Sequence, residues 1–294
     1  MKKYVITGSI GHISKPVVEG LVKAGKEVHV VTSNSEKVKE IESLGAKALT
    51  GSLFDSAFVK KAFEGAEVVY TMVPPIWQTD NWKASQLEVV NNYIQALTGN
   101  KTVKYIVNLS SVGAHLGSGT GPIDAIAALE KELNKLSGIQ VKHLRPTFFY
   151  YNFLSQLPML KHAGIMGGNY GEQKIALVSP HDIAEVALEE LLKLTFTGNS
   201  VRYISSDERT GNEIAEVLGN AIGKKFPWVV FTDEQLLKGF QEGGLPLTHA
   251  RAYTEMGAAM RSGRLLEDYQ KNKPAFSKTK LDDFANEFKA AFAG

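Results

Sequence analysis

The first thirty residues contain a glycine-rich turn, GSIGHIS, between an apolar segment and an amphipathic one. Residues 3–6 (KYVI) have the composition of a short buried strand, and residues 16–24 repeat apolar side chains at helical spacing before Gly25. A second apolar segment follows at 27–31 (EVHVV). A strand, a glycine turn, a helix and a second strand form a βαβ unit, which places its strands in a parallel sheet. The chain is therefore restricted to the α/β class.

The same alternation continues along the first two thirds of the chain. Further strands are expected at residues 46–49, 67–70, 105–109 and 141–144, with helices at 36–44, 58–63, 82–98 and 123–136. This order predicts a doubly wound parallel sheet with helices on both faces, the Rossmann arrangement. Later segments are shorter, with helices expected at 211–223, 232–239, 247–261 and 280–292. We expect a nucleotide-binding domain of residues 1–152 and 176–196, and a smaller, mixed but mostly helical C-terminal lobe of residues 153–175 and 197–294.

The composition excludes several classes of partner. The 33 basic and 31 acidic residues give a net charge of +2, and no run of like charge is present to neutralise a row of phosphates. The chain has no cysteine, which removes disulfides, thiolate nucleophiles and zinc–cysteine sites. No apolar run approaches the roughly 18 residues of a membrane span, and no basic and apolar leader precedes the first strand. We expect a cytoplasmic protein with no nucleic-acid partner, no membrane segment and no metal.

The position of the glycine turn favours a dinucleotide as its ligand. In a parallel sheet the first strand–helix turn faces the ligand crevice at the carboxyl ends of the strands. Gly8 permits a tight turn, Gly11 leaves room for a pyrophosphate, and the helix behind them offers free backbone N–H groups. Ser14 stands where a third glycine is usual. The alternative is a tight turn that binds nothing.

The end of the second strand bears on which dinucleotide is preferred. An NAD site usually has Asp or Glu there to hold the ribose 2′-hydroxyl, whereas this chain has Thr32, Ser33 and Asn34. No carboxylate is present to repel a 2′-phosphate, and Lys37 lies one helical turn further on. NADP is therefore favoured over NAD, although Lys37 is equally explained as a solvated helix residue.

Five segments in sequence order resemble one family. They are TGSIGHIS, GSLFD at 51–55, NLSSVGA at 108–114, LRPTFFYYN at 144–152 and SPHDIAEVA at 179–187. The segments ISSDERTGNEIAEVLGNAIGK and KTKLDDFANEF extend the likeness to the C-terminus. Together they resemble the NmrA-like proteins, a family of atypical short-chain dehydrogenases/reductases. The resemblance implies a Rossmann core, a small C-terminal lobe and a cleft between them.

The resemblance also implies which residues hold the cofactor. The pyrophosphate is expected at Gly8, Ser9, Gly11, His12 and Ile13, the adenosine ribose at Ser33, Asn34 and Lys37, and the adenine at Ser52 and Leu53. The middle of the cofactor is expected at Met72, Val73 and Pro74, and the nicotinamide at Asn108, Leu109, Ser110, Pro146, Thr147 and Phe149. Members of the family often carry Arg where this chain has Ser33 and Asp where it has Ser52, so these two positions depart from the pattern.

The proton donor of ordinary short-chain dehydrogenases is missing. Those enzymes pair a Tyr with a Lys four residues later, and the Lys lowers the pKa of the phenol. Aligned on the following SGIQVKHLRPTFF, these positions fall at Ile126 and Glu130, which cannot replace the pair. The remaining candidates for a catalytic role are Ser111, His115 and Tyr151, and an ordinary structural role is the alternative for each.

Three functions are compatible with these features. A carbonyl or sugar-nucleotide redox enzyme needs the missing acid, whose loss costs about 10²–10⁴-fold. A reductase of quinone-like or other conjugated small molecules needs no dedicated acid, because delocalisation stabilises the reduced anion. A non-catalytic sensor of NADP(H) that signals to a protein partner is the third possibility. The apolar and aromatic segments at residues 74–77 and 148–151 favour the reductase.

Overall fold

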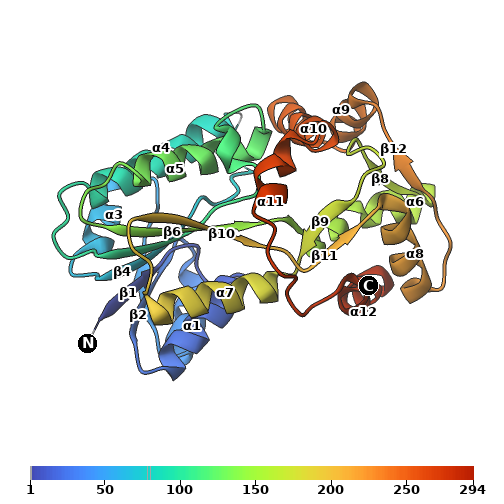
Figure 1. Cartoon of the computed structure of the whole chain (residues 1–294). Coiled ribbons are helices and arrows are strands. Elements are labelled where there is room, and N and C mark those ends of the chain that lie inside the picture. The colour runs from blue at the N-terminus through green and yellow to red at the C-terminus, as the bar shows by residue number, and fades with distance from the viewer. Residues whose placement is uncertain (1, 78, 80) are drawn as a thin grey trace.

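The computed structural model describes residues 2–77, 79 and 81–294, and its centre is a parallel sheet (Figure 1). Within this part of the chain the sheet has seven strands in the order β10-β6-β5-β4-β1-β2-β3. Their bounds are β1 Lys3–Ile6, β2 Glu27–Thr32, β3 Lys47–Thr50, β4 Val68–Met72, β5 Tyr105–Leu109, β6 Gln140–Pro146 and β10 Asn199–Ile204. The strand order reverses between β1 and β4, which is where ligands bind in open α/β sheets. The predicted Rossmann arrangement is confirmed.

Helices cover both faces of this sheet (Figure 1). One layer consists of α1 Ser14–Lys23, α2 Val38–Ser43 and α7 Pro180–Lys193, and the other of α3 Ser56–Phe63, α4 Trp82–Leu97 and α5 Asp124–Leu133. Successive strand residues point to opposite faces, so Tyr4 and Ile6 pack with the α1 layer while Val5 packs with the α4 layer. Because both faces are covered, the inner strands are mostly apolar, and the polar side chains that they do carry, such as Thr71 and Asn108, are hydrogen-bonded to each other.

The remainder of the chain surrounds a third apolar core. This core contains Tyr150, Phe153, Leu218, Trp228 and Phe288, all buried. Its helices are η4 Tyr150–Gln156, α6 Leu157–Ala163, α8 Gly211–Ile222, α9 Asp233–Glu242, α10 Leu247–Arg261, η5 Arg264–Leu266, α11 Glu267–Lys271 and α12 Leu281–Ala293. Its strands are β7 Phe148–Phe149, β8 Met166–Gly168, β9 Ile175–Val178, β11 Asp207–Arg209 and β12 Trp228–Val230. Three short helices, η1 Ser35–Lys37, η2 Ala114–Leu116 and η3 Gly121–Ile123, lie in loops after strands of the main sheet.

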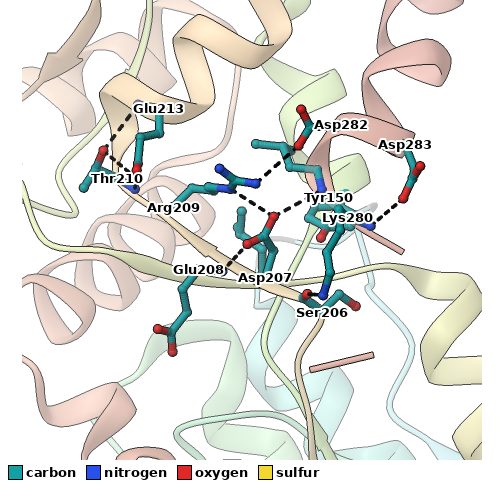
Figure 2. A network of polar contacts seen from close by, with 12 residues as sticks. Tyr150, Ser206, Asp207, Glu208, Arg209, Thr210, Glu213, Lys280, Asp282 and Asp283 are labelled. Carbon is teal, nitrogen blue, oxygen red and sulfur yellow. Dashed lines mark hydrogen bonds and ion pairs between the residues drawn. The ribbon is translucent and has the colours of Figure 1, made fainter. Parts of the chain in front are cut away.

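Polar contacts fix the start of α12 against β11 (Figure 2). The Asp207 carboxylate accepts a hydrogen bond from Arg209 Nε at 2.9 Å, and Arg209 Nη2 lies 3.3 Å from the Asp282 carboxylate. Lys280 Nζ donates to the carbonyl of Ser206 at 2.7 Å. These bonds satisfy charged groups at the place where the last helix joins the third core.

The strands β9 and β10 each belong to a different sheet from the one expected from the division into two lobes. Residues 197–294 were expected in the smaller lobe, but β10 is an edge strand of the main sheet and pairs with β6 in parallel. Residues 176–196 were expected in the larger domain, but β9 joins a small sheet of order β11-β9-β7. An edge strand is half exposed, so the polar segment NSVRYI does not look like a sheet strand in the sequence. The division into two lobes itself stays a prediction.

None of the described helices is both long and apolar enough to cross a membrane.

Candidate functional site

The glycine turn is fixed between β1 and β2 by its backbone conformation. Gly8 and Ser9 both adopt the left-handed region, with φ of 89° and 58°. A Cβ on Gly8 would lie 2.9 Å from Met72 Cγ, so this position requires glycine. The Ser9 N–H donates to the Val31 carbonyl at 3.0 Å, and its hydroxyl donates to Thr32 Oγ1 at 3.0 Å. The turn is thus rigid before any ligand binds.

Gly11 differs from Gly8 because the fold does not require it. A Cβ on Gly11 would meet nothing within 4 Å, and its φ lies outside the left-handed region. The space above it is open, in front of the first turn of α1. This is the geometry expected where a pyrophosphate approaches the backbone at a helix N-terminus.

Two lysines lie together at the expected adenosine end, Lys37, which the sequence indicated, and Lys15, which it did not. Lys37 Nζ lies 2.9 Å from one carboxylate oxygen of Glu40, and Lys15 Nζ, from the first turn of α1, lies 3.0 Å from the other. Hydrogen bonds from Lys37 and Lys15 lower the pKa of Glu40. Asn34 uses its side-chain oxygen to cap η1, accepting from the Glu36 N–H at 2.8 Å, while Ser33 is exposed. Lys15 follows directly after the glycine turn, but nothing in the sequence placed it beside Lys37.

The other expected cofactor positions lie in loops after β3 and β4. Ser52 accepts a hydrogen bond from the Phe54 N–H at 3.1 Å, and the carbonyl of Leu53 accepts from Asn92 at 2.9 Å. Two residues of α4 hold the next loop, because Tyr93 donates to the Met72 carbonyl at 3.0 Å and Gln86 to the Pro74 carbonyl at 3.2 Å. Both loops are thus fixed by α4.

A cavity of about 490 Å³ opens at the carboxyl ends of β4, β5 and β6. Of the expected site residues it brings together Ile13, Met72, Val73, Leu109, Ser110, Ser111, Thr147, Phe149 and Tyr151. Its further walls include Pro75, Trp82, Gln86, Ile123, Ile126 and Met256. No Asp, Glu, Lys or Arg is among the described residues that line it. It is an apolar, uncharged compartment next to the glycine turn.

Helix α10 closes the outer side of this cavity, which the sequence did not indicate. The ring of Trp77 stacks on His249 and on Tyr253, with centroids 5.9 and 6.0 Å apart. His249 Nε2 lies 3.2 Å from the carbonyl of Ile76, so the ring nitrogen donates to the loop after β4. On the inner side the His12 and Tyr151 rings lie 5.3 Å apart. The periodicity of α10 predicted a helix but gave no information about what the helix covers.

The two positions of the missing Tyr–Lys pair face different surroundings. Ile126 lines the cavity, as the alignment with short-chain dehydrogenases implies. Glu130 is buried and forms a double hydrogen bond with Arg145, at 3.0 and 2.6 Å, while the hydroxyl of Ser110 donates to it at 2.5 Å. Burial alone would raise the pKa of Glu130, but Arg145 and Ser110 lower it below its usual value. Glu130 is therefore an anion committed to an ion pair.

The same ion pair connects the sheet to α11. Arg145 Nη1 lies 3.0 Å from the Tyr203 hydroxyl and 3.1 Å from Asp268, and Tyr203 donates to Asp268 at 2.5 Å. His115, a candidate for catalysis, is near these charges and does not line the cavity. Burial lowers its pKa, and within the described chain both of its ring nitrogens are buried without a hydrogen-bond partner. Its placement does not suit an acid that must reach an acceptor.

Asn108, expected near the nicotinamide, has its side chain hydrogen-bonded inside the sheet. It is fully buried, accepting from Thr71 at 2.9 Å and donating to His143 Nδ1 at 3.1 Å. His143 Nε2 in turn donates to Asn134 at 2.9 Å, so the imidazole is neutral, and burial lowers its pKa to about 4. The amide of Asn108 is thus used inside the sheet, and its expected place beside the nicotinamide stays a prediction. Pro146 is buried too, and its carbonyl accepts from the Val112 N–H at 2.9 Å.

One group of metal-ligand type lies outside the cavity. His181, Asp182 and Glu185, on α7, have ligand atoms within 4.8 Å of one another. The buried Asp182 carboxylate already accepts hydrogen bonds from Ser206 at 2.6 Å and Thr279 at 2.9 Å. Hydrogen bonding within the protein therefore explains its position.

A reversed strand order with a glycine turn at its switch point defines a Rossmann protein of the dinucleotide-binding type. The chain matches the model of the NmrA-like family over residues 1–262, and it belongs to that family. The resemblance seen in the sequence is confirmed.

Individual relatives are distant but span most of the chain. An NAD(P)H azoreductase of Xenophilus azovorans is 24% identical over 258 residues, 86% of each protein. Quinone oxidoreductase 2 of Escherichia coli is 24% identical over 267 residues, 90% of each. The structure of an Escherichia coli NADPH-dependent quinone oxidoreductase complexed with NADPH matches 97% of this chain and 99% of its own, with TM-score 0.82 and 22% identity. The Citrobacter triphenylmethane reductase complexed with NADP(H) covers the same shares, with TM-score 0.80 and 19% identity. These structural likenesses show the fold.

Proposed function

We propose that this protein is an NADPH-dependent reductase of neutral, conjugated small molecules, quinones above all. The observation that carries the proposal is the uncharged cavity, which lies against the glycine turn and has Ile126 where a proton donor would stand. The relatives named as an azoreductase and a quinone oxidoreductase act on conjugated acceptors, which supports this substrate class. We also propose that the protein acts in the cytoplasm.

The residues around the turn fit a dinucleotide. Open space above Gly11 would take the pyrophosphate, and Lys15 and Lys37 would face a 2′-phosphate. Ile13 and Thr147 line the cavity between this end and the acceptor, where the nicotinamide would lie. When bound, the reduced cofactor supplies a hydride, and the protein supplies position and a dry surrounding.

The cavity favours acceptors that need no enzymic acid. The Ser110 proton is held by Glu130 and that of Ser111 by the Val112 carbonyl at 2.9 Å, so neither hydroxyl has a proton to offer an alkoxide. A quinone spreads the charge that it gains over its conjugated system. Apolar walls that hold it beside the nicotinamide can then provide most of the rate.

An ionised acceptor should be excluded, because the described residues that line the cavity offer no Asp, Glu, Lys or Arg as a counter-charge. Removing a charge from water costs several kcal/mol unless a partner compensates for it. We expect NADPH oxidation with 1,4-naphthoquinone, and at least a hundredfold lower kcat/KM with its 2-sulfonate, a matched acceptor that differs by one anionic group. Equal rates with both compounds would contradict the proposed cavity.

A binding measurement on the same protein separates the proposal from its main alternative. Gly11→Val should remove NADPH binding without disturbing the fold, since its side chain would enter only the open space. Gly239→Val, where a Cβ also meets nothing within 4 Å, is the matched control and should bind NADPH normally. Tight NADPH binding by the wild type with no oxidation by any conjugated acceptor would favour a redox sensor that acts on a protein partner.

A further inference from the structure

Most polar side chains around the cavity have their donors occupied. Gln86 donates to the Pro74 carbonyl at 3.2 Å and His249 to the Ile76 carbonyl at 3.2 Å, while Ser110 and Ser111 donate to Glu130 and Val112. Thr147 is an exception, because its hydroxyl has no partner among the described residues, but the residue is only 3% exposed and the oxygen is closed off from solvent. The donors that a ligand can use must therefore come from other lining residues.

Two tyrosines differ from this pattern. Tyr151, from η4, and Tyr253, from α10, both line the cavity, and in the described part of the chain neither hydroxyl has a hydrogen-bond partner. Five buried tyrosines, Tyr4, Tyr93, Tyr150, Tyr203 and Tyr269, each donate to a carbonyl or carboxylate, whereas the Tyr70 hydroxyl is buried inside the protein without a partner among the described residues. Tyr151 and Tyr253 are only half-buried and line the cavity, so a ligand in the cavity can accept a hydrogen bond from each phenol.

The two phenols come from different elements of the cavity wall, η4 and α10. Tyr151 lies over the glycine turn, with its ring 5.3 Å from that of His12, whereas Tyr253 lies on the outer wall, stacked on Trp77 at 6.0 Å. Burial, and in second place the nearby Tyr151 phenol, raises the pKa of Tyr253 to about 12, and burial raises that of Tyr151. Both side chains therefore remain O–H donors at neutral pH and cannot act as bases.

We propose that Tyr253, together with Tyr151, donates hydrogen bonds to the oxygen atoms of the acceptor and selects conjugated carbonyl compounds over hydrocarbons of the same shape. This rests on the proposed function and names two residues that position its substrate. Asn152 is also on the cavity wall, but its amide presents an acceptor as well as a donor and so discriminates less.

The chemistry of the reaction explains why donors are useful there. A C–H bond of the dihydronicotinamide breaks, and its hydrogen moves with both electrons to the quinone, which is reduced while the nicotinamide is oxidised. The product carries one negative charge on oxygen until a proton from water completes the hydroquinone. Hydrogen bonds to that oxygen strengthen as its charge develops, so the phenols should act on the rate more than on ground-state binding.

The test is removal of each hydroxyl alone. Tyr253→Phe keeps the ring on Trp77, and Tyr105→Phe, at the opposite end of β5, is the matched control. Calorimetry in the presence of NADP⁺, where no reduction occurs, would measure the binding of 1,4-naphthoquinone and of naphthalene. We expect Tyr253→Phe and Tyr151→Phe each to weaken quinone binding about three- to tenfold and to leave naphthalene binding unchanged. kcat/KM should fall further than binding does, while the affinity for NADPH should remain that of the wild type.

Each other outcome has a definite meaning. Equal weakening of quinone and naphthalene binding would show that the hydroxyl only shapes the cavity. No change in the binding of either compound would show that the hydroxyl does not reach the acceptor. Either result would overturn the role of the two phenols and leave the proposed reductase function standing. If the wild type neither binds nor reduces the quinone, the proposed function fails and the inference fails with it.

Discussion

Among the described residues, no Asp, Glu, Lys or Arg lines the acceptor cavity, whereas the regions on both sides of it contain ion pairs. On one side the buried Glu130–Arg145 pair connects α5 to β6. On the other side, at the expected adenosine end, Glu40 lies between Lys15 and Lys37. The difference indicates a division of labour: charge holds elements together or meets a phosphate, and the compartment for the acceptor is kept neutral.

A single turn of α5 separates the cavity from the buried Glu130–Arg145 pair. Ile126 and Glu130 are four residues apart and lie on the same side of the helix, yet only Ile126 is part of the cavity wall. Ser110 also lines the cavity and donates its proton to the Glu130 carboxylate. The position that holds the Lys of the Tyr–Lys pair in ordinary short-chain dehydrogenases therefore holds a structural anion in this protein.

The largest expected effect comes from breaking the buried pair. Glu130→Leu leaves the Arg145 guanidinium, which is only 8% exposed, without its main partner and should lower the free energy of unfolding by about 3–5 kcal/mol. Urea denaturation followed by circular dichroism would measure this. Glu132→Leu on the same helix, where the carboxylate is 35% exposed, should change stability by less than about 1 kcal/mol. The double variant Glu130→Leu, Arg145→Met should recover most of the loss. A small effect of Glu130→Leu alone would contradict the role assigned to the pair.

A second expectation concerns His143, which lies next to the charged side of the border. Its pKa is about 4 in the folded protein against 6.5 without the fold, so the unfolded state binds the proton more readily. Stability from this group is complete above pH 6.5 and is lost as the pH falls towards 4, by about 3 kcal/mol in total. Unfolding free energies at pH 7, 5.5 and 4.5 should fall less steeply in His143→Gln than in the wild type. The exposed His162→Gln should follow the wild type; parallel slopes for all three proteins would refute this assignment.

The glycine turn and the outer wall of the cavity differ in how well the sequence predicts them. The turn at Gly8 and Gly11 belongs to one continuous βαβ unit, so local spacing was sufficient to predict its place at the switch point. The resemblance then gave most residues near it. The buried side-chain partners of Asn108, Thr71 and His143, could not be predicted, because the spacing of a strand does not show which residues on neighbouring strands it meets.

The outer wall of the cavity was beyond such reasoning. Trp77 and Tyr253 stack on each other although 175 residues lie between them in the sequence. Nothing in the spacing of either segment encodes that contact, which depends on how α10 packs over the main sheet. In the same way, Arg145 gave no signal that it would meet Glu130.

A smaller effect is expected at the adenosine end, where Lys15 and Lys37 lie beside Glu40. If Lys15 and Lys37 leave Glu40 to bind the 2′-phosphate, replacing both by Met should weaken NADPH about tenfold and leave NADH unchanged. Glu40→Gln should strengthen NADPH binding, because the competing carboxylate is gone. Calorimetric titrations at low salt would test both, with the exposed Lys39→Met as control. Equal losses for NADPH and NADH would mean that the lysines act on the fold and not on the phosphate.

The smallest expected effect is the gain from restoring the missing phenol. Ile126→Tyr places a hydroxyl on the cavity wall, but Glu130 behind it is an anion, which raises the pKa of a neighbouring phenol and does not lower it. The variant should therefore increase the reduction of a simple ketone such as acetophenone by less than about tenfold, well short of the 10²–10⁴ that a matched acid supplies. Adding Glu130→Lys does not repair this, because it sets a second cation beside Arg145 and breaks the buried pair. Steady-state NADPH oxidation with acetophenone and with 1,4-naphthoquinone would measure the balance. Strong ketone reduction by the wild type would show instead that an acid is already present, and Tyr151 and Tyr253 are the groups placed to be that acid.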